Sequence, residues 1–342
     1  MTANLDWKSL GFDYTKTDFN VRYTYTDGKW GEMEVTSDEY VPMHMSASCL
    51  HYGCELFEGL KAFRGVDGKI RLFRPEENAK RFISSARRLC LPEPTVEMFV
   101  KACEECVKRN ARFVPPYESG ASLYLRPVMF GTSVGLGVRP SKDALIVVYC
   151  SPVGPYFKSG IKPIRVAADR SQDRSAQHGT GDVKVGGNYA SSLLCGEMAH
   201  KNGFANVLFL DSVERRFIEE CGAANFFAIK DGQYITPKSP SILPSITNKS
   251  LRQIAQDLGL EVVERPIDIE ELSTFEECGA CGTAAVISPI GFVHDMQTGK
   301  DYQFDMENVG EWSMKLYNTL RDIQYGRCED THGWNLVVEV EE

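Results

Sequence analysis

One lysine, Lys184, lies in a segment whose glycine content restricts what this part of the chain can fold into. Four glycines occur within nine positions, at 179, 181, 186 and 187. The interior of a strand or helix loses stability at such a density, so something other than regular packing must fix this backbone. A lysine held in this way is suited to bind a phosphate or to capture a carbonyl group as an amine. A flexible surface loop with a solvated lysine is the alternative.

The sequence motifs of phosphate loops do not fit this segment. A Walker loop requires G-x-x-x-x-G-K-[ST], in which the hydroxyl after the lysine holds magnesium. Here Val185 follows Lys184, and none of the next four positions holds serine or threonine. The dinucleotide motif G-x-G-x-x-G fails as well, because Lys184 stands where the third glycine is required. The carbonyl-capturing lysine and the surface loop therefore remain.

The composition limits the class of protein. The chain has 342 residues, of which 43% are hydrophobic and 25% charged, as expected for a globular protein large enough for two domains. A formal net charge of −9 argues against a surface for nucleic acid or anionic membranes. No apolar run approaches the length of a membrane span, and the N-terminal residues lack the features of a signal or transit peptide. We therefore expect a cytoplasmic protein.

The cysteines fit the same compartment. There are eleven, an odd number scattered through the chain, which suits reduced thiols. Cys103 and Cys106 lie in a helical pattern, and Cys278 and Cys281 precede an apolar segment. A four-thiolate zinc site would need two such pairs at a much shorter separation. We therefore expect core cysteines and no metal site, while a redox or metal-binding protein built on Cys278 and Cys281 stays an alternative.

The domain boundary is expected near the middle of the chain. Residues 150–163 contain three prolines and two glycines and separate two regions of mixed pattern. The predicted organisation is a small N-terminal domain at 1–152, an interdomain loop at 153–165 and a larger C-terminal domain at 166–342. The predicted class is α/β (or α+β) with two domains.

Local patterns predict the main elements. Three Asp-Gly pairs, at positions 27, 67 and 231, lie between strand-like runs and predict hairpins. A helix is expected from Pro75, with Arg81 beside its apolar stripe, and others at 189–201 and 251–258, the last ended by Gly259. Further strands are expected at 123–130, 145–150, 206–211, 262–263 and 284–287.

A carbonyl-capturing lysine implies a cofactor such as pyridoxal phosphate, whose groups demand particular partners. The phosphate needs backbone N–H groups or a helix N-terminus, and residues 244–248 precede the 251–258 helix. The ring nitrogen needs a carboxylate, for which Glu219 and Glu220 are candidates. The tight turn at 282–285 offers further amides. Each signal has a plain alternative: Ser245 and Thr247 as ordinary N-caps, and the glutamates as surface residues.

Taken together, these segments resemble the branched-chain aminotransferases, pyridoxal-phosphate enzymes of fold-type IV. The matching stretches follow the family order across nearly the whole chain; they lie at 51–61, 72–75 through 81, 123–127, 151–157, around 184, at 220–225 and at 282–285. The length and the run Leu-Phe-Glu-Gly-Leu-Lys-Ala-Phe-Arg-Gly at 56–65 are most similar to the eukaryotic-type subgroup, which some bacteria also carry.

The resemblance implies roles for the cofactor-binding residues. Lys184 would form the Schiff base with pyridoxal 5'-phosphate and move the proton during the reaction. Glu220 would pair with the ring nitrogen, and Tyr189 would donate to the 3-oxygen. The phosphate would be held by Arg81, Ile246, Thr247 and Thr283.

The resemblance also implies the substrates. The α-amino group of leucine, isoleucine or valine would pass to 2-oxoglutarate, giving the branched-chain 2-oxo acid and glutamate. The branched side chain would lie among Tyr52, Phe57 and Tyr124, and Arg126 would bind the side-chain carboxylate of glutamate. The α-carboxylate would bind the amides of Ala284 and Ala285 with help from Tyr124. A homodimer is implied, in which Leu136 and Val138 reach the partner's pocket.

The sequence departs from the family pattern at three positions. Ala285 and Ser288 stand where some relatives carry a redox-active Cys-x-x-Cys, so that switch should be absent. Ala223 replaces a threonine that relatives often have near the cofactor ring. Within the same fold, a D-amino-acid transaminase and an aminodeoxychorismate lyase are the alternatives, although both are expected to lack the Tyr-x-Arg-Pro and Leu-Phe-Glu-Gly patterns.

Overall fold

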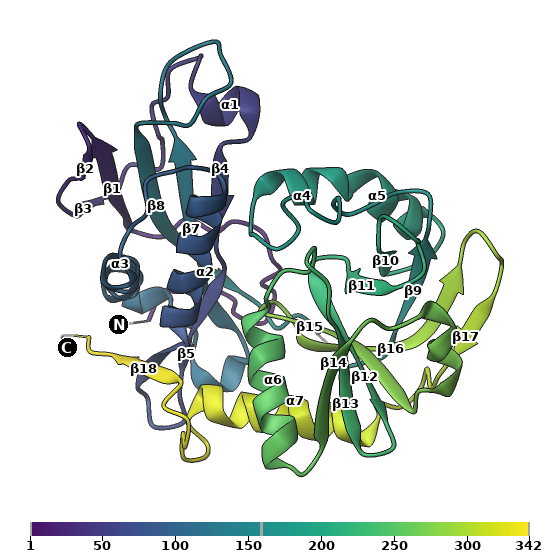
Figure 1. Cartoon of the computed structure of the whole chain (residues 1–342). Helices are drawn as coiled ribbons and strands as arrows, with labels where there is room; N and C mark the ends of the chain where they lie inside the picture. The colour runs from purple at the N-terminus through teal and green to yellow at the C-terminus, as the bar shows by residue number, and fades with distance from the viewer. Residues whose placement is uncertain (1, 158–159, 341–342) are drawn as a thin grey trace. The chain divides into compact units, whose positions relative to one another are not determined.

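The computed structural model describes residues 2–157 and 160–340, and the chain forms two compact units (Figure 1). The first comprises Met1–Lys158, Val183–Gly186 and Asp322–Glu342; the second comprises Ser159–Asp182 and Gly187–Arg321. The predicted two-domain α/β class is confirmed. The limits 1–152, 153–165 and 166–342 remain a proposal, and Lys158 and Ser159 of the predicted interdomain loop lie outside the described residues.

The units differ from the proposed limits in two segments. The loop Val183–Gly186 and the C-terminal segment from Asp322 both pack with the first unit. The last strand, β18 (Asn335–Val338), pairs antiparallel with β6 (Ile70–Phe73) and so extends the first unit's sheet. Because the pairing partner lies more than 260 residues away, no local pattern indicates it.

The first unit contains a sheet of nine described strands in the order β18-β6-β5-β7-β8-β1-β2, with β3 paired to β1 and β4 to β7. All these pairings are antiparallel. The remaining strands are β1 (Asn20–Thr26), β2 (Lys29–Trp30), β3 (Glu34–Thr36), β4 (Glu55–Phe57), β5 (Leu60–Arg64), β7 (Ser122–Gly131) and β8 (Ala144–Val153).

Two amphipathic helices, α2 (Pro75–Arg88) and α3 (Val96–Arg109), pack against this sheet (Figure 1). The expected start of α2 at Pro75 is confirmed, and its buried Ala79, Phe82 and Ala86 repeat at helical spacing. The short helix α1 (Ser48–Tyr52) and the 3₁₀ turns η1 (Ala111–Phe113) and η2 (Tyr117–Ser119) complete the unit.

The three predicted hairpins are present. Asp27 and Gly28 both have positive φ (53° and 78°), as do Asp231 and Gly232 (49° and 74°), which is the backbone of a two-residue type I′ turn. The third connection, between β5 and β6, is longer: only Gly68 has positive φ there, and the N–H of Gly65 donates to the carbonyl of Lys69.

The second unit has a mixed sheet of nine described strands in the order β11-β10-β9-β16-β15-β12-β13-β14, with β17 paired to β16. An additional pairing of β11 with β12 closes six of these strands into a barrel. The strands are β9 (Ile164–Asp169), β10 (Asn206–Leu210), β11 (Ile218–Cys221), β12 (Ala224–Lys230), β13 (Gln233–Pro237), β14 (Glu261–Arg265), β15 (Glu277–Gly282), β16 (Val286–Asp295) and β17 (Asp301–Gln303).

The helices of the second unit correct two predictions. The expected helix at 189–201 is two helices, α4 (Gly186–Ser191) and α5 (Leu193–Lys201), because the chain leaves the helical path at Ser192. The expected strand at 284–287 begins only at Val286, since 283–285 form a turn. Helix α6 (Ile246–Asp257) ends before Gly259 as predicted; η3 (Ile269–Thr274) and α7 (Glu311–Tyr325) follow. None of the helices in the described part of the chain is long and apolar enough to cross a membrane.

Candidate active site

The peptide groups of Lys184 are anchored on both sides. Its N–H donates to Ser85 Oγ (3.0 Å), and its carbonyl accepts from the N–H of Phe57 (3.1 Å). Val185 forms a β-bridge with Leu56, and at Gly186 a Cβ would overlap the carboxylate of Glu55. Because these contacts fix the backbone and half bury the side chain, the interpretation as a flexible surface loop is wrong.

The Lys184 amine lies over an aromatic ring that it shares with an arginine. Its Nζ is 4.9 Å from the centroid of the Phe57 ring, and the Arg126 guanidinium is also 4.9 Å from that centroid. Arg126 Nη2 donates to the Tyr124 hydroxyl (3.4 Å). Since Tyr124 and Arg126 are two residues apart on β7, their side chains share one face of the sheet. Gly59 leaves room for them, because a Cβ there would overlap the Tyr124 hydroxyl.

Arg81 is held by a buried carboxylate. Its Nε and Nη2 donate to the two oxygens of Glu58 (2.7 and 2.8 Å), whose side chain is 0% exposed. Asn78 Nδ2 and the N–H of Gly59 also donate to Glu58 Oε2 (2.7 and 3.1 Å). Burial alone raises the pKa of Glu58, but the ion pair with Arg81 and the charge of Lys184 outweigh it, so the pKa lies below its ordinary value. The carboxylate is therefore charged and holds the guanidinium in one orientation.

The remaining predicted residues of the first unit lie nearer the surface. The Tyr52 hydroxyl donates to the carbonyl of Leu136. The side chains of Leu136 and Val138 are 86% and 84% exposed. Within this unit the structure thus brings Phe57, Tyr124, Arg126 and Lys184 together, while Tyr52 contacts the loop that carries Leu136.

In the second unit, Glu220 is a buried carboxylate on β11, only 2% exposed, so its interpretation as a surface residue is wrong. Its Oε1 accepts from the N–H of Leu243 (2.6 Å) and lies 3.3 Å from Arg174 Nη2. Arg174 in turn donates to the carbonyls of Gly181 (3.0 Å) and Ser241. The neighbouring Glu219 is also buried, but it accepts from Ser239 and Ser241 instead.

The start of α6 is tied to the same strands. Ser245 caps the helix by accepting from the N–H of Asn248 (3.2 Å), so the plain capping prediction is confirmed for Ser245. Ile246 and Thr247 form its first turn and are buried. Asn225, which pairs with Glu220 across β11 and β12, donates to the carbonyl of Leu243 (3.1 Å). The carboxylate of Glu220 and the N-terminus of α6 are therefore fixed relative to each other.

The turn at 283–285 follows β15, which pairs with β12. Thr283, Ala284 and Ala285 are half-buried there. Val286 has φ of 68°, and the N–H of Ile287 donates to the carbonyl of Ala285 (2.9 Å), which makes a γ-turn. A positive φ is rare for a β-branched residue, so the surrounding strands hold this turn in a strained shape. Tyr189 is half-buried in α4, and Ala223 is exposed in the β11–β12 turn.

The cysteine pairs lie in the two cores. Cys103 and Cys106 are buried in α3, and Cys278 and Cys281 are buried in β15. Burial raises the pKa of Cys281 to about 12, which keeps its thiol protonated at neutral pH. In residues 2–157 and 160–340, no cluster of three or more His, Cys, Asp or Glu side chains could hold a metal ion.

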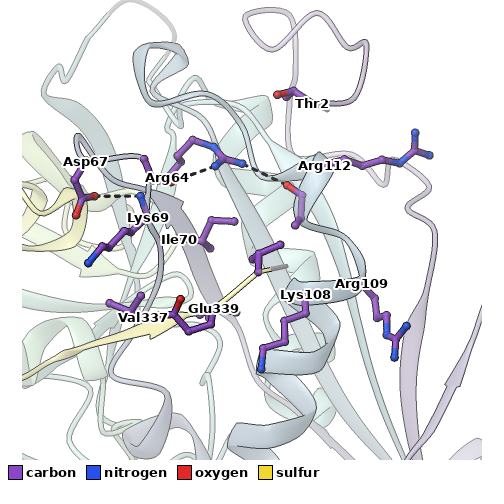
Figure 2. A pocket seen from close by; sticks show the side chains of 14 residues that line it. Thr2, Arg64, Asp67, Lys69, Ile70, Lys108, Arg109, Arg112, Val337 and Glu339 are labelled. Carbon is purple, nitrogen blue, oxygen red and sulfur yellow. Dashed lines mark hydrogen bonds between the residues drawn. The ribbon is translucent and has the colours of Figure 1, made fainter. Parts of the chain in front are cut away.

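A cavity of about 700 Å³ lies elsewhere in the first unit, and none of the residues predicted for the site lines it (Figure 2). Several cations line it, including Arg64, Lys69, Lys108 and Arg112. Two of these have structural partners: Arg112 Nη2 pairs with Asp18 (2.6 Å), and Arg64 donates to backbone carbonyls, that of Ala111 among them (3.4 Å). Cavity size therefore does not identify the site in this chain.

Three residues that support the site were not indicated by the sequence: Ser85, Glu58 and Arg174. Glu58 lies inside a matching stretch, but nothing in its neighbours shows that it binds Arg81. Ser85 lies four residues after Arg81 on the same helix, and this spacing is the one signal that could have indicated a shared face. Arg174 lies 46 residues from Glu220, and no spacing rule links them.

Comparison with known proteins agrees with this geometry. The profile of the family described as amino-transferase class IV matches residues 55–291. The branched-chain-amino-acid aminotransferase of Haemophilus influenzae is 48% identical over 98% of this chain and 99% of its own length. Among solved structures, the branched-chain amino acid aminotransferase of Escherichia coli has 28% identity and a TM-score of 0.78, covering 95% of this chain and all of that one. That of the organism abbreviated T.th., with pyridoxamine 5'-phosphate, has 26% identity and a TM-score of 0.75, covering 93% and 98%.

The fold and the similarities define a fold-type IV aminotransferase, a class of enzymes that uses pyridoxal phosphate. The chain belongs to the class IV aminotransferase family.

Proposed function

We propose that the enzyme transfers the α-amino group of leucine, isoleucine or valine to 2-oxoglutarate, giving the branched-chain 2-oxo acid and glutamate. The observation that carries the proposal is the placement of the Lys184 amine and the Arg126 guanidinium over one Phe57 ring. An amine for the chemistry, an apolar surface for a branched side chain and a cation for a second carboxylate then lie together. Full-length similarity to an enzyme named for branched-chain substrates supports the same choice.

The donor set fits pyridoxal 5'-phosphate as the cofactor. A fixed guanidinium at Arg81 and the helix N-terminus at Ile246 and Thr247 suit a phosphate. We assign the phosphate to these three residues and Thr283, the ring nitrogen to the buried Glu220, and the 3-oxygen to Tyr189. When bound, the cofactor supplies an aldehyde for the Lys184 amine and an electron sink for the substrate.

Lys184 is assigned the catalytic role. Its Nζ captures the cofactor when substrate is absent and, once released, takes the proton from the substrate Cα. The anchored peptide on both sides limits how far the amine can move between these tasks. Glu220 keeps a negative charge beside the ring nitrogen, which raises the pKa of that nitrogen.

The substrate pocket is assigned to Tyr52, Phe57 and Tyr124, with Arg126 binding the side-chain carboxylate of glutamate. The Tyr124 hydroxyl already accepts from Arg126, so the cation keeps a partner when an apolar side chain occupies the pocket. The N–H groups of Ala284 and Ala285, held by the strained turn at Val286, are assigned to the α-carboxylate.

The assembly is proposed to be a cytoplasmic homodimer. The exposed Leu136 and Val138 are apolar side chains of the kind that a second copy covers, and Leu193 and Leu194 on α5 are exposed as well. Assignment to the eukaryotic-type subgroup is supported by the 56–65 run and by the contrast between 48% identity to the H. influenzae protein and 28% to that of E. coli.

The test is an assay of glutamate formation with purified protein, pyridoxal phosphate and 2-oxoglutarate. L-Leucine, L-isoleucine and L-valine should support turnover, and D-alanine should not. Turnover with D-alanine, or with none of the branched-chain amino acids, would contradict the proposal and favour the D-amino-acid transaminase or the lyase.

A further inference from the structure

One face of helix α2 contacts both the candidate amine and the candidate phosphate ligand. Asn78, Arg81 and Ser85 lie three and four residues apart, so their side chains point the same way. Asn78 and Ser85 are buried, at 2% and 0% exposure. Polar side chains are rarely so completely buried without a specific partner.

The first contact of this face is with Glu58. Two donors of Arg81, the amide of Asn78 and the N–H of Gly59 all reach this carboxylate. Four donors on two oxygens leave the carboxylate with a single orientation, and the paired Nε–Nη2 edge fixes the plane of the guanidinium. The position of the Arg81 cation therefore depends on Glu58.

The second contact is with the peptide of Lys184. Ser85 Oγ accepts from the N–H of Lys184 (3.0 Å) and donates to the carbonyl of Arg81 (2.9 Å). Donation to Arg81 directs the hydroxyl proton away from Lys184, so the oxygen lone pair faces the Lys184 N–H. One hydroxyl thus joins the backbone of Lys184 to the helical turn that carries Arg81.

We propose that Ser85 and Glu58 are positioning residues, Ser85 fixing the backbone of Lys184 and Glu58 fixing the guanidinium of Arg81. The inference rests on the proposed function, in which Lys184 captures pyridoxal phosphate and Arg81 binds its phosphate. The two contacts act on different parts of the cofactor: the amine meets the aldehyde, and the guanidinium meets the phosphate. Their loss should therefore have different signatures.

The experiment compares pyridoxal phosphate with pyridoxal, which lacks the phosphate, as ligands of the cofactor-free enzyme. Capture is followed by the visible absorbance that borohydride bleaches, and affinity by equilibrium titration. Ser85→Ala removes the acceptor of the Lys184 N–H, so capture of both ligands should slow by a similar factor, on the order of tenfold. Ser84→Ala is the matched control, since Ser84 is the next residue on α2 and is exposed.

Glu58→Gln keeps the shape of the side chain but removes the charge that pairs with Arg81. Affinity for pyridoxal phosphate should fall on the order of tenfold, while affinity for pyridoxal stays within about twofold of wild type. Glu76→Gln, at an exposed position of α2, should change neither affinity. A variant that only destabilises the fold would weaken both ligands together.

Two results would overturn the inference: wild-type capture rates in Ser85→Ala, or a ratio of the two affinities in Glu58→Gln that is unchanged or shifted toward pyridoxal phosphate. If Glu58→Gln does not fold, Glu58→Asp keeps the charge but withdraws it from Arg81, and the same loss of phosphate preference is expected. Failure of the proposed function is recognised separately, because wild-type enzyme would then capture neither ligand.

Discussion

Each unit of the chain buries one arginine–glutamate pair, and the two pairs are built differently. In the first unit, Glu58 binds Arg81 through both oxygens and accepts two further hydrogen bonds. In the second unit, Arg174 reaches Glu220 through one oxygen, the same Oε1 that accepts from the N–H of Leu243. In the first pair the carboxylate holds the arginine, and in the second the arginine and the backbone hold the carboxylate.

The difference indicates which partner acts on the cofactor. A four-donor carboxylate such as Glu58 is saturated by protein groups, so the arginine that it orients is the part that can bind a ligand. Arg174 is held by the carbonyls of Gly181 and Ser241, so its charge is positioned to keep Glu220 ionised. Buried ion pairs contribute little net stability, which makes a role in positioning the better account of both.

The largest expected effect tests whether both pairs serve one amine. Lys184→Ala removes the group that captures the cofactor and moves the proton, so turnover should fall by several orders of magnitude. Cofactor should still bind through the phosphate contacts. Steady-state rates and equilibrium dialysis measure the two quantities. Turnover near wild type would mean that another lysine acts and that the comparison of the pairs has no common centre.

The second effect separates the two glutamates of β11. Glu220→Gln cannot keep the ring nitrogen protonated, so removal of the substrate Cα proton should slow by about a hundredfold or more. Single-turnover rates with leucine and Cα-deuterated leucine measure this step. Glu219→Gln is the control, because Glu219 is equally buried but bonded to Ser239 and Ser241. Equal rates in wild type and Glu220→Gln would show that the second pair is only structural.

The third effect concerns the cation that belongs to neither pair. Arg126→Met should slow the half-reaction with 2-oxoglutarate roughly a hundredfold, since a carboxylate would enter the pocket without a partner, and the leucine half-reaction much less. Single-turnover measurements of each half-reaction provide the comparison. Arg64→Met, on the neighbouring strand β5, is a control. Equal losses in both halves would assign Arg126 to the α-carboxylate common to all substrates.

The smallest effect concerns stability against pH. The pKa of Glu58 is lowered in the folded protein, so its carboxylate stabilises the fold above its ordinary pKa of about 4.3, and this stabilisation is lost as the pH falls below that value. Wild type should therefore lose thermal stability on acidification more steeply than Glu58→Gln, with the two melting temperatures converging. Glu76→Gln should follow wild type. A constant difference between wild type and Glu58→Gln at every pH would contradict the pKa shift.

The sequence predicted much of the fold because short-range signals decided it. The Asp-Gly hairpins, the Pro75 start of α2 and the Gly259 end of α6 depend on backbone chemistry within a few residues. The break at Ser192 was missed, since no proline or glycine stands at that position to interrupt the helical pattern. The pairing of β18 with β6 was missed because it joins segments from opposite ends of the chain.

The candidate site shows the same division. Lys184 was indicated by its glycines, and the structure gives one reason: the absence of a Cβ at Gly186 admits the Glu55 carboxylate. Ser85, Glu58 and Arg174 were not indicated, because burial and partner choice decide their roles and neither is encoded in spacing. The strain at Val286 likewise follows from the pairing of β15 with β16.

The central claim is that Lys184 is the amine that captures pyridoxal phosphate. The most direct measurement is borohydride reduction of the enzyme with bound cofactor, followed by proteolysis and mass spectrometry of the modified peptide. The account predicts one phosphopyridoxyl group, attached to Lys184. Lys61 is the most informative competitor, because it is another lysine with little exposure and lies opposite Tyr124 in the β5–β7 pairing. Modification at Lys61, or at any lysine other than Lys184, would contradict the account.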